Sequence, residues 1–178
     1  MRELTVRLRF TKHCLGNTKA KDDSGRFLMP RNPSGQVIFL ATWHRANMLF
    51  ASQVLGRHQD EVQKILWDIT VDGNVPRNRY RRYPGNGNKF VEHECFYPGQ
   101  TVGINCVVPD TISDDDFRQL MQLAGTYRGL SPFHPTKNGF FEVVSMNLRR
   151  RKPVEENNAG KEEQTDMKQN EVKPVPMA

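Results

Sequence analysis

A basic stretch rich in tyrosine is the part of the sequence best suited to chemistry with a ligand. It reads PRNRYRRYPGNGNKF, covers residues 76–90 and contains no acidic side chain. Its basic and aromatic residues are Arg77, Arg79, Tyr80, Arg81, Arg82, Tyr83 and Lys89. Arginine offers a planar, permanently charged fork to phosphate, and tyrosine offers a face on which a base can stack. The stretch predicts contact with a nucleic-acid strand, and an exposed, solvated loop is the alternative.

A second segment, residues 125–139, combines aromatic and basic residues with glycines. Its central part reads SPFHPTK, and the two prolines stiffen it. A rigid loop of this kind can present Phe133 and His134 beside Arg128 and Lys137. These side chains are suited to stack a base and to hold its phosphate.

Potential metal ligands are adjacent in the sequence but lack the spacing of a metal site. His13 is followed by Cys14, and His93 and Cys95 flank Glu94. Neither group has the C-x-x-C or H-x-x-x-H spacing that turns side chains towards one ion. No P-loop, G-x-S-x-G or dinucleotide fingerprint occurs. We predict no metal and no cofactor.

The charge of the 178-residue chain is distributed unevenly. The formal net charge is +6, but residues 153–178 hold three lysines against six acidic residues, a net of −3, which leaves +9 on residues 1–152. The terminal segment has no aromatic residue and no hydrophobic periodicity, so we expect a disordered acidic tail that is dispensable for folding. The basic remainder, one domain over residues 1–152, favours an anionic partner.

Composition also excludes several classes of protein. No apolar run approaches the roughly 20 residues that span a bilayer, and the first ten residues alternate charge with hydrophobe, unlike a signal peptide. Three cysteines at wide spacings argue against a disulfide framework. We expect a cytoplasmic protein with no membrane contact.

Hydrophobic periodicity predicts the first strand and the loop that follows it. Every second residue from 4 to 10 is apolar, and the intervening positions include Arg7 and Arg9, so a half-buried strand with a basic outer face is expected. Residues 12–36 are rich in glycine and basic residues and predict a long basic loop with a short strand at 27–29. The basic positions of the loop that we single out are Lys12, Lys19 and Arg26.

Two longer helices and a short one are predicted. Residues 42–55 are expected to begin at a Thr42 cap and to end before Gly56. The apolar spacing turns four residues of this helix inward: Trp43, Ala46, Phe50 and Val54. Residues 60–66 predict the short helix. Ser113 caps the last helix, and its inward residues are Phe117, Leu120, Met121 and Ala124.

The remaining strands complete a recognisable order of elements. Strands are predicted at residues 66–73, 100–108 and 140–148, and a further one at 89–97 is joined to its successor by a Pro98-Gly99 turn. The order is βαββαβ with a hairpin inserted between the second and third strands. It predicts the α+β, ferredoxin-like class, an antiparallel sheet with the helices on one face and the other face free.

This pattern resembles the RAMP superfamily of CRISPR-associated and related RNA-binding proteins over about residues 3–150. The shared features are the element order, the long basic loop, the hairpin insertion and a glycine-rich loop before the last strand, where Gly125, Gly129 and Gly139 stand. The GFF that ends this loop lacks the second glycine of the family's G-x-G-like turn. An RRM is disfavoured because its aromatic signature is absent. The resemblance implies that residues 77–83 form a thumb against bound RNA.

The resemblance also supplies an enzymatic alternative. Some RAMP proteins cleave RNA without metal, using a histidine near the first helix or an aspartate after the first strand; His44, Asp22 and Asp23 occupy these positions. A single histidine on a helix is more often a packed or a surface residue than a catalytic one, and KDDSG is a good turn sequence. We therefore favour a non-catalytic protein over an endoribonuclease.

The sequence thus predicts non-catalytic binding of single-stranded or guide-like RNA through the basic loop, the open sheet face and the hairpin. Single-stranded DNA is a further possible ligand, and other subunits of a CRISPR-like or phage ribonucleoprotein are the expected protein partners. The alternatives are the metal-independent endoribonuclease and a protein-interaction module of phage or mobile-element type, whose basic loops would dock on an acidic protein.

Overall fold

The computed structural model describes residues 1–16, 21–72, 78–82, 91–130 and 138–148. A four-stranded main sheet is built from β1 (Arg2–Phe10), β3 (Leu66–Asp72), β6 (Thr101–Val108) and β7 (Phe141–Leu148). The strand order is β3-β6-β1-β7, and all three neighbouring pairs are antiparallel. This is the ferredoxin-like arrangement that the sequence predicts.

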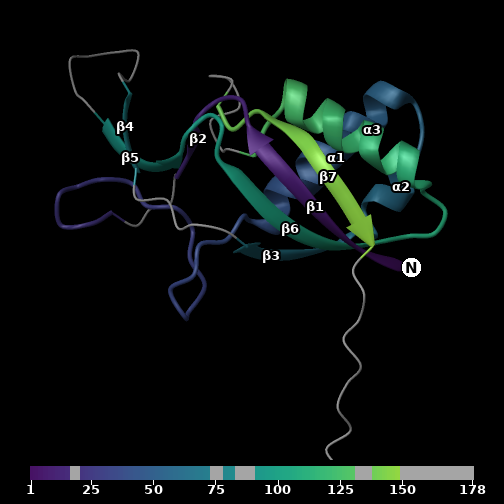
Figure 1. The fold of residues 1–178 in the computed structure, drawn as a ribbon, viewed down its shortest axis with the longest axis horizontal. Coiled ribbons are helices and arrows are strands. Elements are labelled where there is room, and N and C mark those ends of the chain that lie inside the picture. Colours follow the sequence, from purple (N-terminus) through teal and green to yellow (C-terminus); the bar gives the residue numbers. More distant parts are fainter. Residues whose placement is uncertain (17–20, 73–77, 83–90, 131–137, 149–178) are drawn as a thin grey trace, which may run out of the picture.

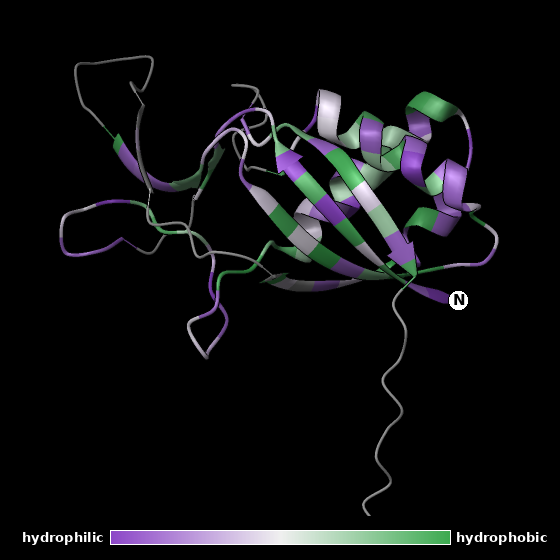
Figure 2. Ribbon diagram, in the orientation of Figure 1, coloured by the Kyte–Doolittle hydropathy of each residue, from purple (hydrophilic) through white to green (hydrophobic). Residues whose placement is uncertain are grey.

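Helices α1 (Ala41–Leu55), α2 (Gln59–Val62) and α3 (Asp114–Tyr127) gather on one side of the main sheet (Figure 1). The alternation along β1 produces this two-layer structure: Leu4, Val6, Leu8 and Phe10 are buried in the core, whereas Arg7 and Arg9 are exposed. Figure 2 shows the same alternation as changes of hydropathy along the strand. The other face of the sheet has no helix over it in the described part of the chain.

The last helix confirms its prediction residue by residue. The Ser113 hydroxyl accepts a hydrogen bond from the Asp116 backbone N–H at 3.1 Å, which caps the helix. Phe117, Leu120 and Met121 are buried against the sheet, as their spacing predicts, and so is Ala124.

The first helix ends at Gly56, as predicted, with that glycine at a φ of 69°. Its predicted cap is wrong, and its predicted inward face is only partly correct: Trp43 packs against the core. Leu40 is the N-cap residue and makes no side-chain hydrogen bond, and Ala46 and Val54 are exposed. The residues that face the core instead are His44, Asn47, Met48, Ala51 and Ser52. Three of these are polar, so apolar spacing alone misplaces the buried face.

The short helix α2 is also shorter than predicted. It ends at Val62, because Leu66 already pairs with Val107 as part of β3.

None of the helices in the described ranges is both long and apolar enough to cross a membrane.

A small second sheet lies beyond the end of the main sheet that is farthest from the N-terminus (Figure 1). It contains β2 (Cys14–Leu15), β5 (Val91–Phe96) and β4 (Asn78–Arg82), in the order β2-β5-β4. The β4–β5 hairpin is inserted between β3 and β6, which confirms the predicted insertion. At 27–29, where a short strand was expected, only Phe27 forms bridges, to Lys21 and His93.

The pairing of β5 differs from the prediction. The turn at Pro98-Gly99 is present, with Gly99 at a φ of 88°, but β5 and β6 belong to different sheets. Both edges of β6 are occupied, by β1 and β3. β5 therefore pairs with β2 and β4 instead.

Gly125 allows α3 to approach β7 closely. A Cβ atom at this position would overlap the carbonyl oxygen of Phe141 and lie 2.7 Å from Cδ2 of its ring. Alanine normally stabilises a helix interior relative to glycine by up to about 1 kcal/mol. Here we expect Gly125→Ala to reduce the free energy of unfolding by about 1–3 kcal/mol, because the overlap involves backbone. Chemical denaturation measures the change.

The matched control is Thr126→Ala, an exposed neighbour on the same helix. We expect it to change the stability by no more than about 0.5 kcal/mol. A Gly125→Ala protein as stable as the parent would contradict the close packing of α3 on β7.

Candidate nucleic-acid interface

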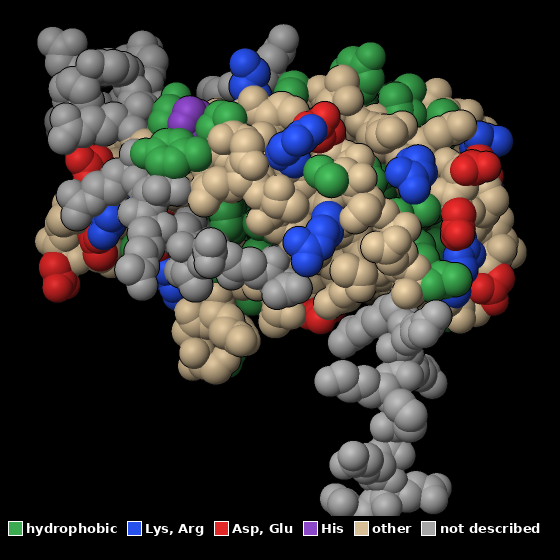
Figure 3. Space-filling view, in the orientation of Figure 1, with side chains coloured by type: hydrophobic (Ala, Val, Ile, Leu, Met, Phe, Trp, Pro, Cys, Tyr) green, Lys and Arg blue, Asp and Glu red, His purple; other side chains and the backbone are tan. Residues whose placement is uncertain are grey.

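The open face of the main sheet carries Arg7 and Arg9 of β1. Arg7 lies opposite Gly103 of β6 and Ser145 of β7, two small residues, so its guanidinium is exposed. Among the described residues Arg7 has no ion-pair partner. Figure 3 shows basic side chains standing on a surface made mostly of backbone and uncharged polar groups.

Arg9 is paired, in contrast to Arg7. Its Nε donates to Oε1 of Glu142 on β7 at 2.5 Å, and both side chains are about half exposed. An exposed pair of this kind contributes only about 0–1 kcal/mol. A phosphate can therefore replace the Glu142 carboxylate at little cost.

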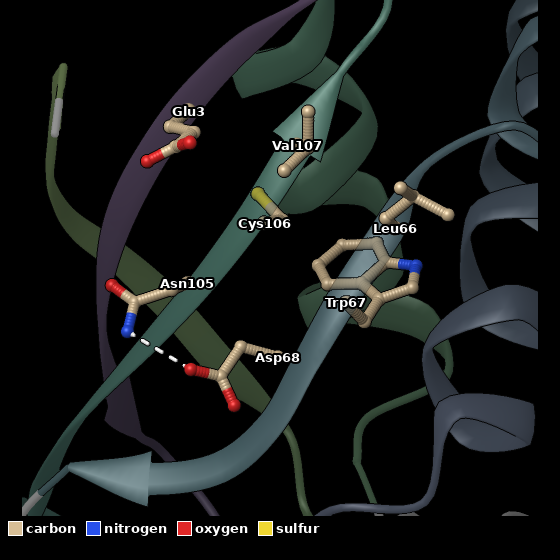
Figure 4. Close-up of a pocket in the computed structure, with 7 residues that line it drawn as sticks. All are labelled: Glu3, Leu66, Trp67, Asp68, Asn105, Cys106 and Val107. Carbon is tan, nitrogen blue, oxygen red and sulfur yellow. Dashed lines mark hydrogen bonds between the residues drawn. The ribbon is translucent and has the colours of Figure 1, made fainter. Parts of the chain in front are cut away.

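The opposite end of the open face is acidic and contains a hollow of about 200 Å³ (Figure 4). Glu3, Asp68 and Asn105, from β1, β3 and β6, line it together with apolar groups of the same strands. The Asn105 amide oxygen accepts from Thr5 Oγ1 at 2.7 Å, and its Nδ2 lies 3.5 Å from Asp68 Oδ2. Two carboxylates repel phosphate, so the basic outer face predicted for β1 does not extend to this end of the sheet.

The chain continues from the basic end of β1 through Lys12 to His13. Arg7, Arg9 and Lys12 are named here the β1 track; all three are exposed. The imidazole of His13 contacts the ring of Tyr80 on β4, with centroids 4.5 Å apart, and the ring of Tyr97 at 5.1 Å. These three side chains are named the ring cluster. Figure 3 shows a histidine among hydrophobic side chains at this end of the molecule.

The sequence singled out Tyr80 as a candidate but not its ring partners His13 and Tyr97. The three come from separate segments, and only the hairpin pairing, which sets Tyr80 opposite His93, brings Tyr80 back to residue 13. Burial, and then the charge of Lys12, lower the pKa of His13. The neutral form of the His13 imidazole is therefore favoured at neutral pH.

A partly buried ion pair between Arg31 and Glu94 attaches the long loop to the hairpin. Both Glu94 carboxylate oxygens accept from Arg31, Oε2 from Nη1 at 2.9 Å and Oε1 from Nη2 at 2.6 Å, and Oε2 also accepts from the Met29 backbone N–H at 2.7 Å. The neighbouring His93 is buried, donates from Nδ1 to Gly16 O at 2.6 Å and stacks on Phe27. These contacts position β5, and through it β4.

Strand β4 contains four of the predicted binding residues. Arg79, Tyr80, Arg81 and Arg82 pair in register with Glu94, His93, Glu92 and Val91 of β5. The stretch that suggested nucleic-acid binding is therefore partly a strand of the hairpin and not a loop. The remaining candidates of the two basic segments lie outside the described residues: Lys19, Arg77, Tyr83, Lys89, Phe133, His134 and Lys137.

Two other predicted binding residues, Arg26 and Arg128, interact with side chains of the same chain. Arg26 forms an ion pair with Asp22, and the Arg128 guanidinium lies 4.8 Å from the centre of the Phe50 ring on α1. Neither residue joins the β1 track.

The catalytic candidates occupy structural positions. His44 is 2% exposed and stacks on Trp67, with ring centroids 4.4 Å apart. Burial lowers its pKa to about 3, so the imidazole is neutral at pH 7. Asp22 accepts from Ser24 N–H and Oγ and from Arg26, and these hydrogen bonds, first that of Ser24, hold its pKa well below its usual range. Asp23 is exposed in the same turn.

The cysteines considered as metal ligands are packed in the interior. Cys14 Sγ donates to Leu130 O at 2.8 Å, and Cys14 and Cys95 are buried. Within the described ranges no group of three or more His, Cys, Asp or Glu residues is arranged to hold a metal ion.

The comparisons with known proteins identify a fold and no family. No protein-family model and no curated protein matches the chain. Its structure is similar to a chain in the cryo-EM structure of the Type III-B Cmr-beta bound to cognate target RNA, with a TM-score of 0.54 and 11% sequence identity. The match covers 83% of this chain but 60% of that chain. At this identity the likeness shows the fold alone.

The burial of His44 predicts a pH-dependent stability. Its pKa is about 3 in the folded protein against an ordinary 6.5, so its contribution is complete above pH 6.5 and is lost as the pH falls towards 3. The loss is about 1.4 kcal/mol per pH unit in this window. We expect His44→Phe to lose less stability than the parent between pH 7 and pH 4.5, as measured by denaturant unfolding. Equal losses of stability in the two proteins would show that His44 takes up its proton in the folded state between pH 7 and pH 4.5.

Proposed function

We propose that this protein binds single-stranded RNA without cleaving it, with the β1 track along the open sheet face as the main phosphate contact. The observation that carries the proposal is the exposed Arg7, which stands between Gly103 and Ser145 on a face without a helix. Residues 1–152 carry a net charge of +9, which favours a polyanionic partner. The fold likeness to a chain in an RNA-bound CRISPR structure is consistent with this ligand.

A single strand suits the surface better than a duplex. The open face presents strands and short side chains around Arg7, and the helices of the described part of the chain lie on the other side of the sheet. Same-face residues on a strand are about 7 Å apart, so Arg7 and Arg9 can hold an extended backbone in one direction. The acidic hollow at Glu3 and Asp68 limits phosphate contact to the end nearer the hairpin.

The hairpin provides the second part of the proposed interface. Arg79, Arg81 and Arg82 stand on β4 with Tyr80, whose ring lies beside His13 at the end of the β1 track. RNA that follows β1 is thereby led to the hairpin, which takes the place of the thumb that the RAMP resemblance implies. A role as one subunit of a CRISPR-like ribonucleoprotein is part of the same proposal.

A salt titration tests the proposal. We expect the affinity for an RNA oligomer to fall by about 10³-fold between 50 and 200 mM salt if six or more phosphates are contacted. Arg7→Gln should weaken binding and reduce the slope of log affinity against log salt by about one. The RNA should be recovered intact.

Arg45→Gln is the matched control, because Arg45 is an exposed arginine on α1, on the helix side of the sheet. It should bind like the parent. A flat salt response, a preference for duplex DNA, or equal effects of the Arg7 and Arg45 substitutions would contradict the proposed interface.

The Arg9–Glu142 pair allows a test in the opposite direction. Glu142→Gln removes the carboxylate that competes with phosphate for Arg9 and leaves a side chain of the same size. We expect RNA affinity to rise by up to about 5-fold, because the exposed pair is worth at most about 1 kcal/mol. Fluorescence anisotropy with labelled RNA measures the change. A loss of affinity would show that Arg9 is not a phosphate contact.

A further inference from the structure

We propose that the ring cluster, His13, Tyr80 and Tyr97, is a stacking site for one unpaired RNA base at the point where the strand passes from the sheet to the hairpin. The inference rests on the proposed RNA binding and adds a site to it. Two of the three residues belong to no sequence motif of RNA binding.

The rings form one continuous surface beside the β1 track. His13 lies between the two tyrosines, 4.5 Å from Tyr80 and 5.1 Å from Tyr97 between ring centroids. Tyr97 is 37% exposed, so part of its ring is accessible to a ligand. The planes of the His13 and Tyr97 rings are inclined at 77°. A base that stacks on one ring can therefore contact the other ring with its edge.

Hydrogen bonds fix the backbone of the segments that carry the three rings. The Tyr97 N–H donates to Gln100 Oε1 at 2.6 Å within the tight turn at Gly99. His13 O accepts from Gly139 N–H at 2.6 Å, and Tyr80 stands on β4 opposite the buried His93. Groups fixed in this way lose little conformational entropy on binding, so more of the stacking free energy appears as affinity.

Charge complementarity favours a nucleotide over other apolar ligands. Lys12 is adjacent to His13 and exposed. Burial, and then the charge of Lys12, lower the pKa of the imidazole, so the ammonium group acts at this site. A nucleotide can stack its base on the ring cluster and place its phosphate beside the Lys12 ammonium group. Because every base has a π face, such a site is tolerant of sequence. An aromatic peptide lacks the phosphate that Lys12 would bind.

The experiment is a double-mutant cycle that combines the removal of one aromatic ring from the protein with the removal of the bases from the RNA. The full-length parent, Tyr80→Leu and Tyr97→Leu are titrated with labelled oligoadenylate RNA of about 12 nucleotides and with an abasic oligomer of the same length. We expect each leucine variant to bind oligoadenylate about 5- to 150-fold more weakly than the parent and to bind the abasic oligomer equally well. The salt slope should not change, because stacking releases few counterions.

Matched variants separate stacking from other effects. Tyr80→Phe and Tyr97→Phe keep the ring and should bind like the parent. Tyr127→Leu removes a tyrosine that is 57% exposed on α3, away from the ring cluster, and should also bind like the parent. Thermal unfolding of every variant confirms that the affinities are those of folded protein.

Several outcomes would overturn the inference. The first is that the leucine variants bind oligoadenylate like the parent. The second is that they lose the same affinity for the abasic oligomer as for oligoadenylate. The third is that the phenylalanine variants lose as much affinity as the leucine variants. If these results accompany a parent that binds RNA with a steep, Arg7-dependent salt slope, the stacking site fails and the proposed function stands. A parent that binds neither oligomer at low salt would overturn both.

Discussion

The hydrogen bonding of β1 on both of its edges is the constraint on which the rest of the structure depends. Its residues pair with β6 from Arg2 to Arg9 and with β7 from Leu4 to Phe10. Because side chains alternate along a strand, a slip of one residue would turn Leu8 to solvent and Arg7 into the core. The core and the proposed RNA-binding face are therefore specified by the same set of backbone hydrogen bonds.

The elements that the sequence predicts best are those whose signals are local. Ser113 and the residues that follow it predict α3 because a cap and a hydrophobic stripe are both contained in one helical segment. The buried face of α1 could not be found in this way. Asn47 faces the core because its Nδ2 donates to Gly129 O, 82 residues away. The residues near Asn47 in the sequence do not predict that acceptor.

The candidate interface shows the same division between local and distant information. Arg7, Arg9, Lys12 and Tyr80 could be identified from the sequence because each belongs to a basic or alternating segment. The ring cluster could not, since it requires the register of β4 on β5 and the turn before β6. The charge of the sheet face was overestimated for a related reason: Asp68 and Glu142 come from strands whose neighbours in the sheet cannot be known from β1 alone.

The position of β1 has a consequence for synthesis on the ribosome. This strand is made before its partners: it pairs with β6, about a hundred residues later, and with β7, where Arg9 meets Glu142 at a separation of 133 residues. Until those segments emerge, an amphipathic strand has two unpaired edges, which is the condition under which nascent chains associate wrongly. The main sheet closes late and through contacts of high sequence separation, which are slow to form. Wrong association of β1 is therefore favoured during the interval before β6 and β7 are made.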